Sequence, residues 1–277
     1  MRYVLVALLC CGLFLSCARK VSDEEAIKEL IDELENVLGM GEHYTKEEGD
    51  TATQEKSYVW VFWYRSVDSA NVEVNVSITG DSAFVEINKT VYGVFHRFPA
   101  ETLPPETLVD KPKPLEDLFI RYATFEKTGP RRHHRGWCLK RLSDAKVESQ
   151  LGGPNIRIDS VKVIAGNDSL IIKDPFEFSD TLNVLNCSQG EKVKVYTYIS
   201  PVDTPCLVFL HAPGYTRHIR RICSRLGNGI FYGECEVMRK GFGRIAVDVI
   251  WKPSLFEDDE TTYPYCSRAW IINIRCR

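Results

Sequence analysis

The sequence predicts two modules: an α+β cone, in which an N-terminal helix lies on a curved antiparallel sheet, and then an all-β sandwich. Three observations support this prediction. An apolar stripe with helical spacing occupies 27–38, long runs of alternating apolar residues follow it, and short strand signals recur beyond residue 154. Apolar residues three or four positions apart indicate a helix, whereas strict alternation indicates a half-buried strand.

The composition is that of an ordinary globular protein. The chain has 277 residues, of which 44% are hydrophobic and 26% are charged. This profile is too apolar for a disordered chain, and the length allows one large domain or two small ones. The formal charge of −3, from 35 basic and 38 acidic residues, gives no reason to expect nucleic acid or another polyanion as a partner.

The first domain is expected to open with a helix. Ser22 and Glu25 have the spacing of a capping box in front of the apolar stripe, and Gly39 is a natural stop. The period then becomes two, Gly80 turns the chain, and 83–98 returns as a second long strand. These elements would close the cone, with the helix on the concave face of the sheet.

The remaining segments of the first domain are less regular. Residues 58–64 are so uniformly apolar that their periodicity does not decide between helix and strand. Residues 99–116 hold five prolines and predict an exposed loop. Residues 118–127 and 137–142 predict a hairpin, closed by a tip that contains the basic run 131–135.

The second half carries only short strand signals. The best boundary is the glycine-rich segment at 150–154, and the strands beyond it are separated by turn residues, of which Asn228 and Gly229 are the clearest. No segment there has a helical period, which favours a β-sandwich.

The N-terminus has the pattern of an export signal. Arg2 precedes an apolar run at 3–15, too short for a membrane-spanning helix, which needs about 20 residues. Ser16 and Cys17 follow the run, a small residue directly before a cysteine, and this junction resembles the lipobox of bacterial lipoproteins. In those proteins the signal peptide is cut before the cysteine, which is then acylated. Phe14 stands where they usually have an aliphatic residue.

The lipobox resemblance implies an organisation and a location. It gives a signal peptide at 1–16 and a lipidated tether at 17–21, with Cys17 as the lipidation site. The helix and strand patterns divide the rest into a cone domain at 22–147 and a sandwich domain at 155–277. Acyl chains would hold the protein on a membrane of the bacterial cell envelope, facing the periplasm or the exterior. Ala18 after the cysteine resembles lipoproteins sent to an outer membrane. The alternative is an ordinary signal peptide with an incidental cysteine.

Four segments of the first domain carry a further resemblance: the helix at 24–38, SITGDSAFVEI at 77–87, RYATFEK at 121–127 and GWCLKRLSD at 136–144. They are similar to the nuclear-transport-factor-2-like superfamily (SnoaL-like, cystatin-type), whose members enclose an apolar pocket. The second half resembles an immunoglobulin-like module, without a clear form of the Cys…Trp…Cys spacing. Together the halves resemble bacterial lipoproteins of uncharacterised function that join these modules.

The cysteines of the second half suggest disulfides more than a metal site. Cys206, His211, His218 and Cys223 have a palindromic spacing that suggests zinc. Side chains five residues apart on a strand leave opposite faces, so these four cannot meet one ion without a β-bulge, and we expect no metal. A cross-strand contact or disulfide between Cys206 and Cys223 is predicted instead. The other pairings stay open, and several cysteines are equally well explained as small buried hydrophobes.

The mouth of the cone is the expected ligand site. Its candidate lining residues are Trp60, Trp63, Tyr64, His96, Tyr122 and Trp137. His96 is the one catalytic candidate, as the only histidine on a predicted strand of this domain, but no carboxylate has a spacing that selects it as a partner. The alternative is that these aromatic residues form a core.

The sequence therefore favours a non-catalytic, lipid-anchored envelope protein that binds an unknown protein or small molecule and needs no cofactor. An isomerase- or dehydratase-type enzyme, or a ligand carrier, using the cone pocket is the second hypothesis, and a structural spacer is the third. The basic run 131–135 suggests contact with anionic lipid or acidic glycan, or a solvated loop tip. The acidic run 257–260 predicts an ordinary acidic loop rather than a calcium site.

Overall fold

The computed structural model describes residues 21–34, 52–54, 57–100, 109–130, 132–180, 184–213, 218–238 and 240–277. Its first element is helix α2 (Asp23–Glu33), with Ser22 as the N-cap. Glu25 N donates a hydrogen bond to Ser22 Oγ, and Ser22 N donates one to the Glu25 carboxylate, which confirms the predicted capping box. The predicted continuation of this helix to residue 38 lies outside the described residues.

Four long strands follow as an antiparallel meander. They are β2 (Ser57–Thr79), β3 (Ser82–Ala100), β4 (Lys113–Lys127) and β5 (Trp137–Ser149), and a short β1 (Ala52–Gln54) pairs with the start of β2. The undecided run at 58–64 is therefore strand. Gly80 closes the first hairpin with a φ of +62°, which residues with a Cβ rarely adopt. The 3₁₀ turn η2 (His134–Gly136) leads into β5.

A β-bulge follows Val67 and reverses the side-chain alternation of β2. Before the bulge, odd-numbered residues such as Trp63 point into the molecule. After it, even-numbered residues such as Val74 pack on the core, as the alternating pattern predicts. Gly93 lies opposite the bulge, where an added Cβ would lie only 1.9 Å from the Ser66 carbonyl oxygen. Only glycine fits this close approach of two strands.

The described part of the second half consists of short strands and one short helix. The elements are β6 (Arg157–Ala165), β7 (Asp168–Ile172), β8 (Phe178–Asp180), β9 (Leu185–Cys187), β10 (Glu191–Ser200), β11 (Cys206–Pro213), β12 (His218–Ile222), β13 (Ser224–Gly227), β14 (Ile230–Val237), β15 (Gly241–Trp251), α4 (Lys252–Phe256) and β16 (Ser267–Cys276). Asn228 and Gly229 turn between β13 and β14 with φ of +50° and +70°, as their positions in the sequence predict.

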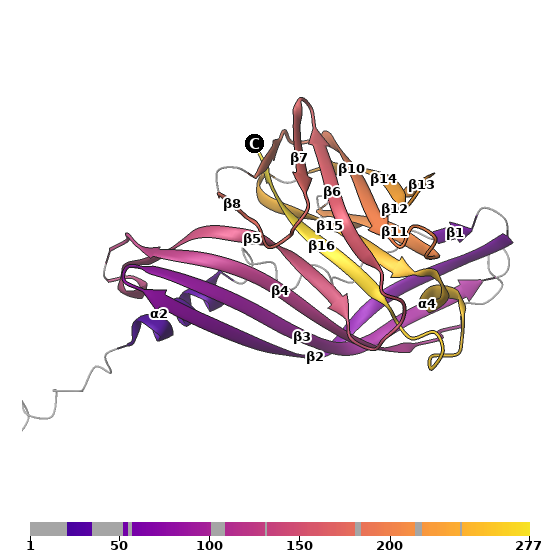
Figure 1. Ribbon diagram of the computed structural model, residues 1–277, viewed down its shortest axis with the longest axis horizontal. Coiled ribbons are helices and arrows are strands. Elements are labelled where there is room, and N and C mark those ends of the chain that lie inside the picture. The colour runs from indigo at the N-terminus through magenta and orange to yellow at the C-terminus, as the bar shows by residue number, and fades with distance from the viewer. Residues whose placement is uncertain are drawn as a thin grey trace, which may run out of the picture.

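The described strands form two sheets. The larger has the order β1-β2-β3-β4-β5-β16-β15-β11-β12, with β8 against β5 and β9 against β16, and the smaller has the order β13-β14-β10-β6-β7. The last strand, β16, pairs with β5, so the long meander and part of the second half share one continuous sheet (Figure 1). The segment at 150–154, where the sequence places the domain boundary, connects β5 of the larger sheet to β6 of the smaller one.

The described core residues fall into three clusters. The first fills the space between the two sheets and includes Val247 of β15. In the second, Ile27 of α2 packs on the inner face of the meander beside Phe119. In the third, Trp63 near the start of β2 meets Phe209 of β11. The larger sheet therefore curls back on itself, and its β15–β11 part is covered on both faces.

The predicted α+β cone is wrong. Among the described residues, α2 and α4 are the only α-helices, and the two sheets make up most of the chain, so the architecture is all-β and sandwich-like. The reason is that the meander does not close around a helix. Its sheet continues through β16 into the sandwich, and β11 and β15 fill most of the concave side that a larger helical layer would cover.

Candidate functional site

The interior that the sequence predicts as a ligand cone is filled by side chains. Trp63 is 1% exposed, and its ring lies 5.0 Å from that of Phe209 and 5.5 Å from that of Phe95, between centroids. The guanidinium carbon of Arg220 lies 3.7 Å from the centre of the Trp63 ring, and Arg220 Nη2 donates to the Trp63 carbonyl oxygen at 2.8 Å. Trp63 is therefore a core residue.

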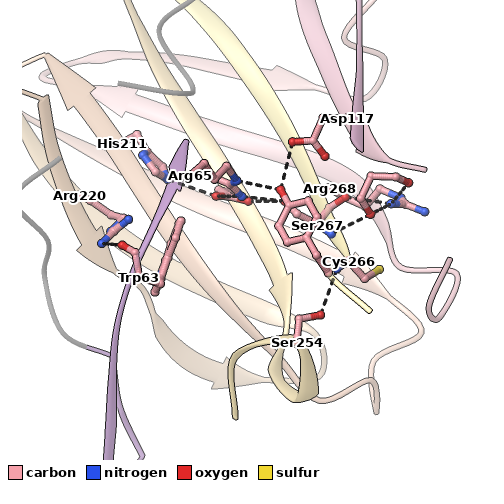
Figure 2. Close-up of polar contacts among 12 residues, drawn as sticks. Trp63, Arg65, Asp117, His211, Arg220, Ser254, Cys266, Ser267 and Arg268 are labelled. Atoms are coloured by element: carbon pink, nitrogen blue, oxygen red, sulfur yellow. Dashed lines mark hydrogen bonds and ion pairs between the residues drawn. The ribbon is translucent and has the colours of Figure 1, made fainter. Parts of the chain in front are cut away.

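A buried polar network joins the meander to the second half of the chain (Figure 2). Arg65 Nη2 donates to Asp248 Oδ2 at 2.8 Å, and Arg65 Nε donates to the Tyr265 hydroxyl oxygen at 2.8 Å. Ser267 Oγ donates to Asp248 Oδ1 at 2.6 Å, and the Tyr265 hydroxyl donates to Asp117 Oδ2 at 3.1 Å. Each of these five residues is at most 5% exposed.

The electrostatics of this network favour a charged Arg65 and a protonated Tyr265. Burial alone would lower the pKa of the Arg65 guanidinium, but Asp248, Tyr265 and Asp117 together raise it above its ordinary value. Burial raises the pKa of the Tyr265 hydroxyl well above its ordinary value, so the phenol keeps the proton that it donates. His211 Nε2 lies 3.4 Å from Asp248 Oδ2. Since these groups are inaccessible and bind one another, their role is to hold β2 against β15 and β16.

His96 lies on the opposite, outer face of the meander. Its Nδ1 is 2.6 Å from Asp110 Oδ2, its Nε2 is 3.0 Å from Ser66 Oγ, and the Tyr64 ring stacks on it with centroids 4.5 Å apart. The His96 side chain is 20% exposed. The sequence does not predict Ser66 and Asp110 as partners of His96. Ser66 comes near His96 only through the strand register, which pairs it with Val94, and Asp110 lies in the proline-rich segment before β4, which has no periodic pattern.

A serine, an imidazole and a carboxylate in this order can move a proton. If Nδ1 carries a hydrogen toward Asp110, Nε2 is the acceptor for the Ser66 hydroxyl hydrogen, with the tautomer assigned from these partners. Ser66 nevertheless occupies a regular ladder position, and its hydroxyl also lies 3.4 Å from the Val94 carbonyl oxygen. Nucleophilic serines are typically raised on a strained turn instead, so this triplet lacks part of a hydrolytic site.

A hollow of about 410 Å³ opens on the same outer face, near the hairpin ends of the meander. The residues that line it come from all four long strands: Ser77, Thr79, Ser82, Ala83, Phe84, Thr124, Phe125, Glu126, Lys140 and Arg141. Because side chains alternate along β3, Ala83 and Val85 are buried while Phe84 stays 41% exposed. We call this feature the Phe84 hollow. Its volume is within the range of small-molecule sites, roughly 300–1,000 Å³.

Aromatic rings from both halves of the chain form a wall beside the Phe84 hollow. The centroid of Phe84 lies 5.4 Å from that of Tyr122 and 6.2 Å from that of Phe178, and Tyr122 lies 4.7 Å from Phe176. Phe176 and Phe178 come from the connection after β7 and from β8, which pairs with β5. Burial raises the pKa of the Tyr122 hydroxyl, which keeps it neutral and able both to donate and to accept.

The polar groups of the hollow are mostly uncharged hydroxyls. Four serine and threonine side chains supply them, and an ion pair also lines the hollow, in which Lys140 Nζ lies 3.2 Å from Glu126 Oε2. Arg141 is exposed beside them. Donors and acceptors therefore meet next to an exposed ring, an arrangement that suits a hydroxyl-rich ligand more than an apolar one.

The predicted lining residues whose side chains are described do not meet in one pocket, although Tyr64 and His96 stack on each other. Tyr122 borders the Phe84 hollow, Tyr64 and His96 lie farther along the outer face, and Trp63 is in the core. Trp137 is 2% exposed in the cluster around α2. Trp60 belongs to β2, but its side chain lies outside the described residues, as does Cys17.

Cys206 and Cys223 carry free thiols in the structure and are both buried. The β11–β12 hairpin pairs His211 with Arg220, two residues away from the predicted partner, so Cys223 lies beyond the strand and donates its backbone N–H to the Val208 carbonyl. Within the described ranges, no group of three or more His, Cys, Asp or Glu residues is arranged to hold a metal ion.

Part of the basic hairpin tip holds helix α2. Arg135 Nε lies 2.6 Å from Asp23 Oδ1, Lys127 Nζ lies 3.0 Å from Asp23 Oδ2, and His134 Nε2 lies 2.9 Å from Glu33 Oε2. The hydrogen bonds from Arg135 and Lys127 lower the pKa of Asp23 to about 2. These contacts give the tip a structural task that neither sequence interpretation included.

Comparison with known proteins gives no family: no family model matches the chain, and no curated protein or solved structure matches it significantly. Among the helices in the described residues, none is long and apolar enough to cross a membrane.

Proposed function

We propose that this chain is a lipid-anchored, non-catalytic protein of a bacterial cell envelope that binds a saccharide in the Phe84 hollow. The observation that carries the proposal is the hollow itself: an exposed aromatic ring beside several hydroxyl side chains and one ion pair, on the outer face of a rigid sheet. A site on paired strands is held more firmly than one on loops.

The chemistry of the lining favours a sugar over other ligands. An apolar ligand would leave the serine and threonine hydroxyls without partners, which is costly. An extended peptide pairs with a free strand edge, and β3 and β4, which carry Phe84 and Thr124, are paired on both sides. A peptide added to the edge of β2, whose described pairing with β1 ends at Val61, would lie beside the Phe84 hollow rather than in it. A pyranose has an apolar ring face that stacks on phenylalanine and a rim of hydroxyls that bind Ser82, Thr124 and the Glu126–Lys140 pair.

The anchor would place the hollow near a membrane. The tether at 17–21 spans at most about 18 Å, at roughly 3.3–3.6 Å per residue, so the start of α2 would stay close to the acylated Cys17. Helix α2 is fixed to the β4–β5 hairpin by Asp23, and the Phe84 hollow lies toward that end of the meander. We favour the outer membrane as the location, because Ala18 after the cysteine resembles lipoproteins sent there.

Labelling with palmitate tests the anchor. We expect label on the wild-type chain and none on Cys17→Ala. Equal label on both, or the intact first methionine on protein recovered from the cell interior, would remove the lipoprotein part of the proposal and leave the saccharide site standing.

Binding to an array of oligosaccharides tests the site, with two variants of one strand. Phe84→Ala should weaken binding about tenfold or more, as expected when an aromatic anchor is removed. Tyr92→Ala is the matched control, because Tyr92 lies farther along β3 and is similarly exposed, 43% against 41% for Phe84. Equal loss in both variants, or no binding by the wild type, contradicts the proposal. A structural spacer predicts the last result.

One specific geometry favours hydrolysis as a second candidate. The order Ser66–His96–Asp110 is that of a nucleophile, its base and an orienting carboxylate, at 3.0 Å and 2.6 Å. Because His96 points outward, this candidate replaces the isomerase or dehydratase expected in the cone. A fluorophosphonate probe should label the wild type and Ser69→Ala but not Ser66→Ala if it is correct. An unlabelled wild type ends it.

A further inference from the structure

The final strand of the chain brings two buried cysteines side by side. Strand β9 lies parallel to β16, and their register pairs Ile274 with Leu185, Arg275 with Asn186, and Cys276 with Cys187. Cys187 is 4% exposed and Cys276 is 3% exposed, and both belong to the core between the two sheets. Since they occupy paired positions and both point into this core, their side chains leave the sheet on the same face.

This register satisfies the main geometric condition for a disulfide. Neighbouring strands lie about 4.8 Å apart, and bridged cysteines have Cα atoms roughly 4.4–6.8 Å apart. In the structure both thiols are reduced, and Cys187 Sγ donates weakly to the Arg275 carbonyl oxygen at 3.6 Å. Burial raises the pKa of the Cys187 thiol to about 12, and the adjacent Cys276 thiol adds to the effect.

The other cysteines are placed less favourably. Cys138 is exposed on the outer part of the meander, and Cys266 packs on the backbone of Gly153. Cys206 and Cys223 are out of register, as described above. Cys235 shares the core with Cys187 but lies on β14 of the opposite sheet. Among the described strands, only the β9–β16 pair joins two cysteines through its register.

We propose that Cys187 and Cys276 form a disulfide in the exported protein. The inference rests on the envelope location proposed above, because disulfides persist in oxidising compartments. Two thiols lose two protons and two electrons as the S–S bond forms. A disulfide-bearing oxidant takes up the electrons by thiol–disulfide exchange and becomes a dithiol. Because both sulfurs are buried, the bond forms while the chain folds rather than afterwards.

The bond would staple a strand on which the whole architecture depends. Strand β16 pairs with β5 and β15, so it connects the meander to the sandwich. Its end is held on one side by only the three-residue β9. The closed loop contains every strand from β10 to β16, and a cross-link over so long a loop restricts the unfolded chain strongly.

The experiment uses the full chain in two preparations. Purified protein is refolded in an oxidised and reduced glutathione buffer, alkylated without reduction, digested and analysed by mass spectrometry. We expect one linked peptide pair containing Cys187 and Cys276, lighter by two hydrogen masses than the two free thiols. The melting temperature of the refolded protein should fall by several degrees when the disulfide is reduced. The fall should persist in Cys206→Ser, another buried cysteine, and disappear in Cys276→Ser.

The two parts of the inference fail separately. Full alkylation of Cys187 and Cys276 in the refolded wild type, or linkage of either to another cysteine, overturns the proposed pair. The second preparation is protein taken from cells under acid quench. Linkage in the refolded protein without linkage in cells overturns the oxidising location, and with it the envelope part of the proposed function, while the pairing stands.

Discussion

Arg65 Nη2 lies 2.8 Å from Asp248 Oδ2, although 183 residues separate them in the chain, and both side chains are almost inaccessible. This ion pair connects β2 of the meander to β15 of the sandwich sheet. It occupies the interior in which the sequence predicts an open pocket. Together with Trp63, it explains why candidate sites are found on the outer face.

Replacing Arg65 with methionine should be among the most destabilising single changes in the chain. It leaves the Asp248 carboxylate buried without its strongest partner, and breaking a buried pair costs about 3–5 kcal/mol. Urea denaturation measures the free energy of unfolding. Arg65→Met combined with Asp248→Leu should lose less than the sum of the two single changes. Strict additivity would show that the pair is not coupled.

Gly93→Ala tests the close approach at the β2 bulge. A Cβ at this position would lie 1.9 Å from the Ser66 carbonyl oxygen, so the strands must separate. We expect a loss of about 1–3 kcal/mol, typical of overpacking. Ser69→Ala, on the exposed side of the same bulge, should change stability little. Equal melting temperatures for the two variants would contradict the strand register described here.

The docking of α2 should depend on acid. Arg135 and Lys127 lower the pKa of Asp23 from its ordinary value of 3.8 to about 2. The ionised carboxylate therefore stabilises the fold fully at pH values above that ordinary pKa. This contribution is lost as the pH falls from about 4 toward 2. The protection factors of the amides of residues 23–33, which are exchange rates corrected for the pH dependence of the unstructured chain, should fall over that range in the wild type. In Asp23→Asn, these protection factors should be lower at neutral pH and should depend less on acid.

The contribution of Asp144 to stability should change with pH in the opposite direction to that of Asp23. Burial raises its pKa to about 6, against the effects of the hydrogen bond from Asn273 N and the charge of Arg121. A raised pKa means that the folded state binds the proton more tightly, so stability falls as the pH rises from about 4 to about 6. The loss is at most about 3 kcal/mol, since a tenfold change in protonation is worth roughly 1.4 kcal/mol. Asp144→Asn should flatten this part of a stability–pH curve measured by denaturation.

The local patterns predicted several elements correctly. The capping box at Ser22 and Glu25, the turn at Gly80 and the turn at Asn228 depend only on neighbouring residues, and each is present. The fold class could not be obtained in the same way. It depends on β16 pairing with β5, which brings together residues more than a hundred positions apart and leaves no periodic signal.

The candidate site shows the same division. Alternation along β3 directs the Phe84 side chain away from the face on which Ala83 and Val85 are buried, so the sequence pattern predicts that Phe84 is exposed. Phe176 and Phe178 come near Phe84 only through tertiary packing, which the pattern does not show. The sequence singles out His96 because it is the only histidine on a predicted strand of the first domain. Its partners Ser66 and Asp110 cannot be predicted in this way, because Ser66 is positioned by the strand register and Asp110 lies in a loop without a periodic pattern.

Hydrogen exchange of the intact protein, with and without the oligosaccharide that binds best in the array, tests the central claim most directly. A sugar in the Phe84 hollow should protect the backbone around 77–86, 122–127 and 138–141 and leave the sandwich unchanged. Protection confined to the sheet that contains β10 and β14, or to the strands around Trp63, would contradict the assignment of the binding site to the outer face of the meander.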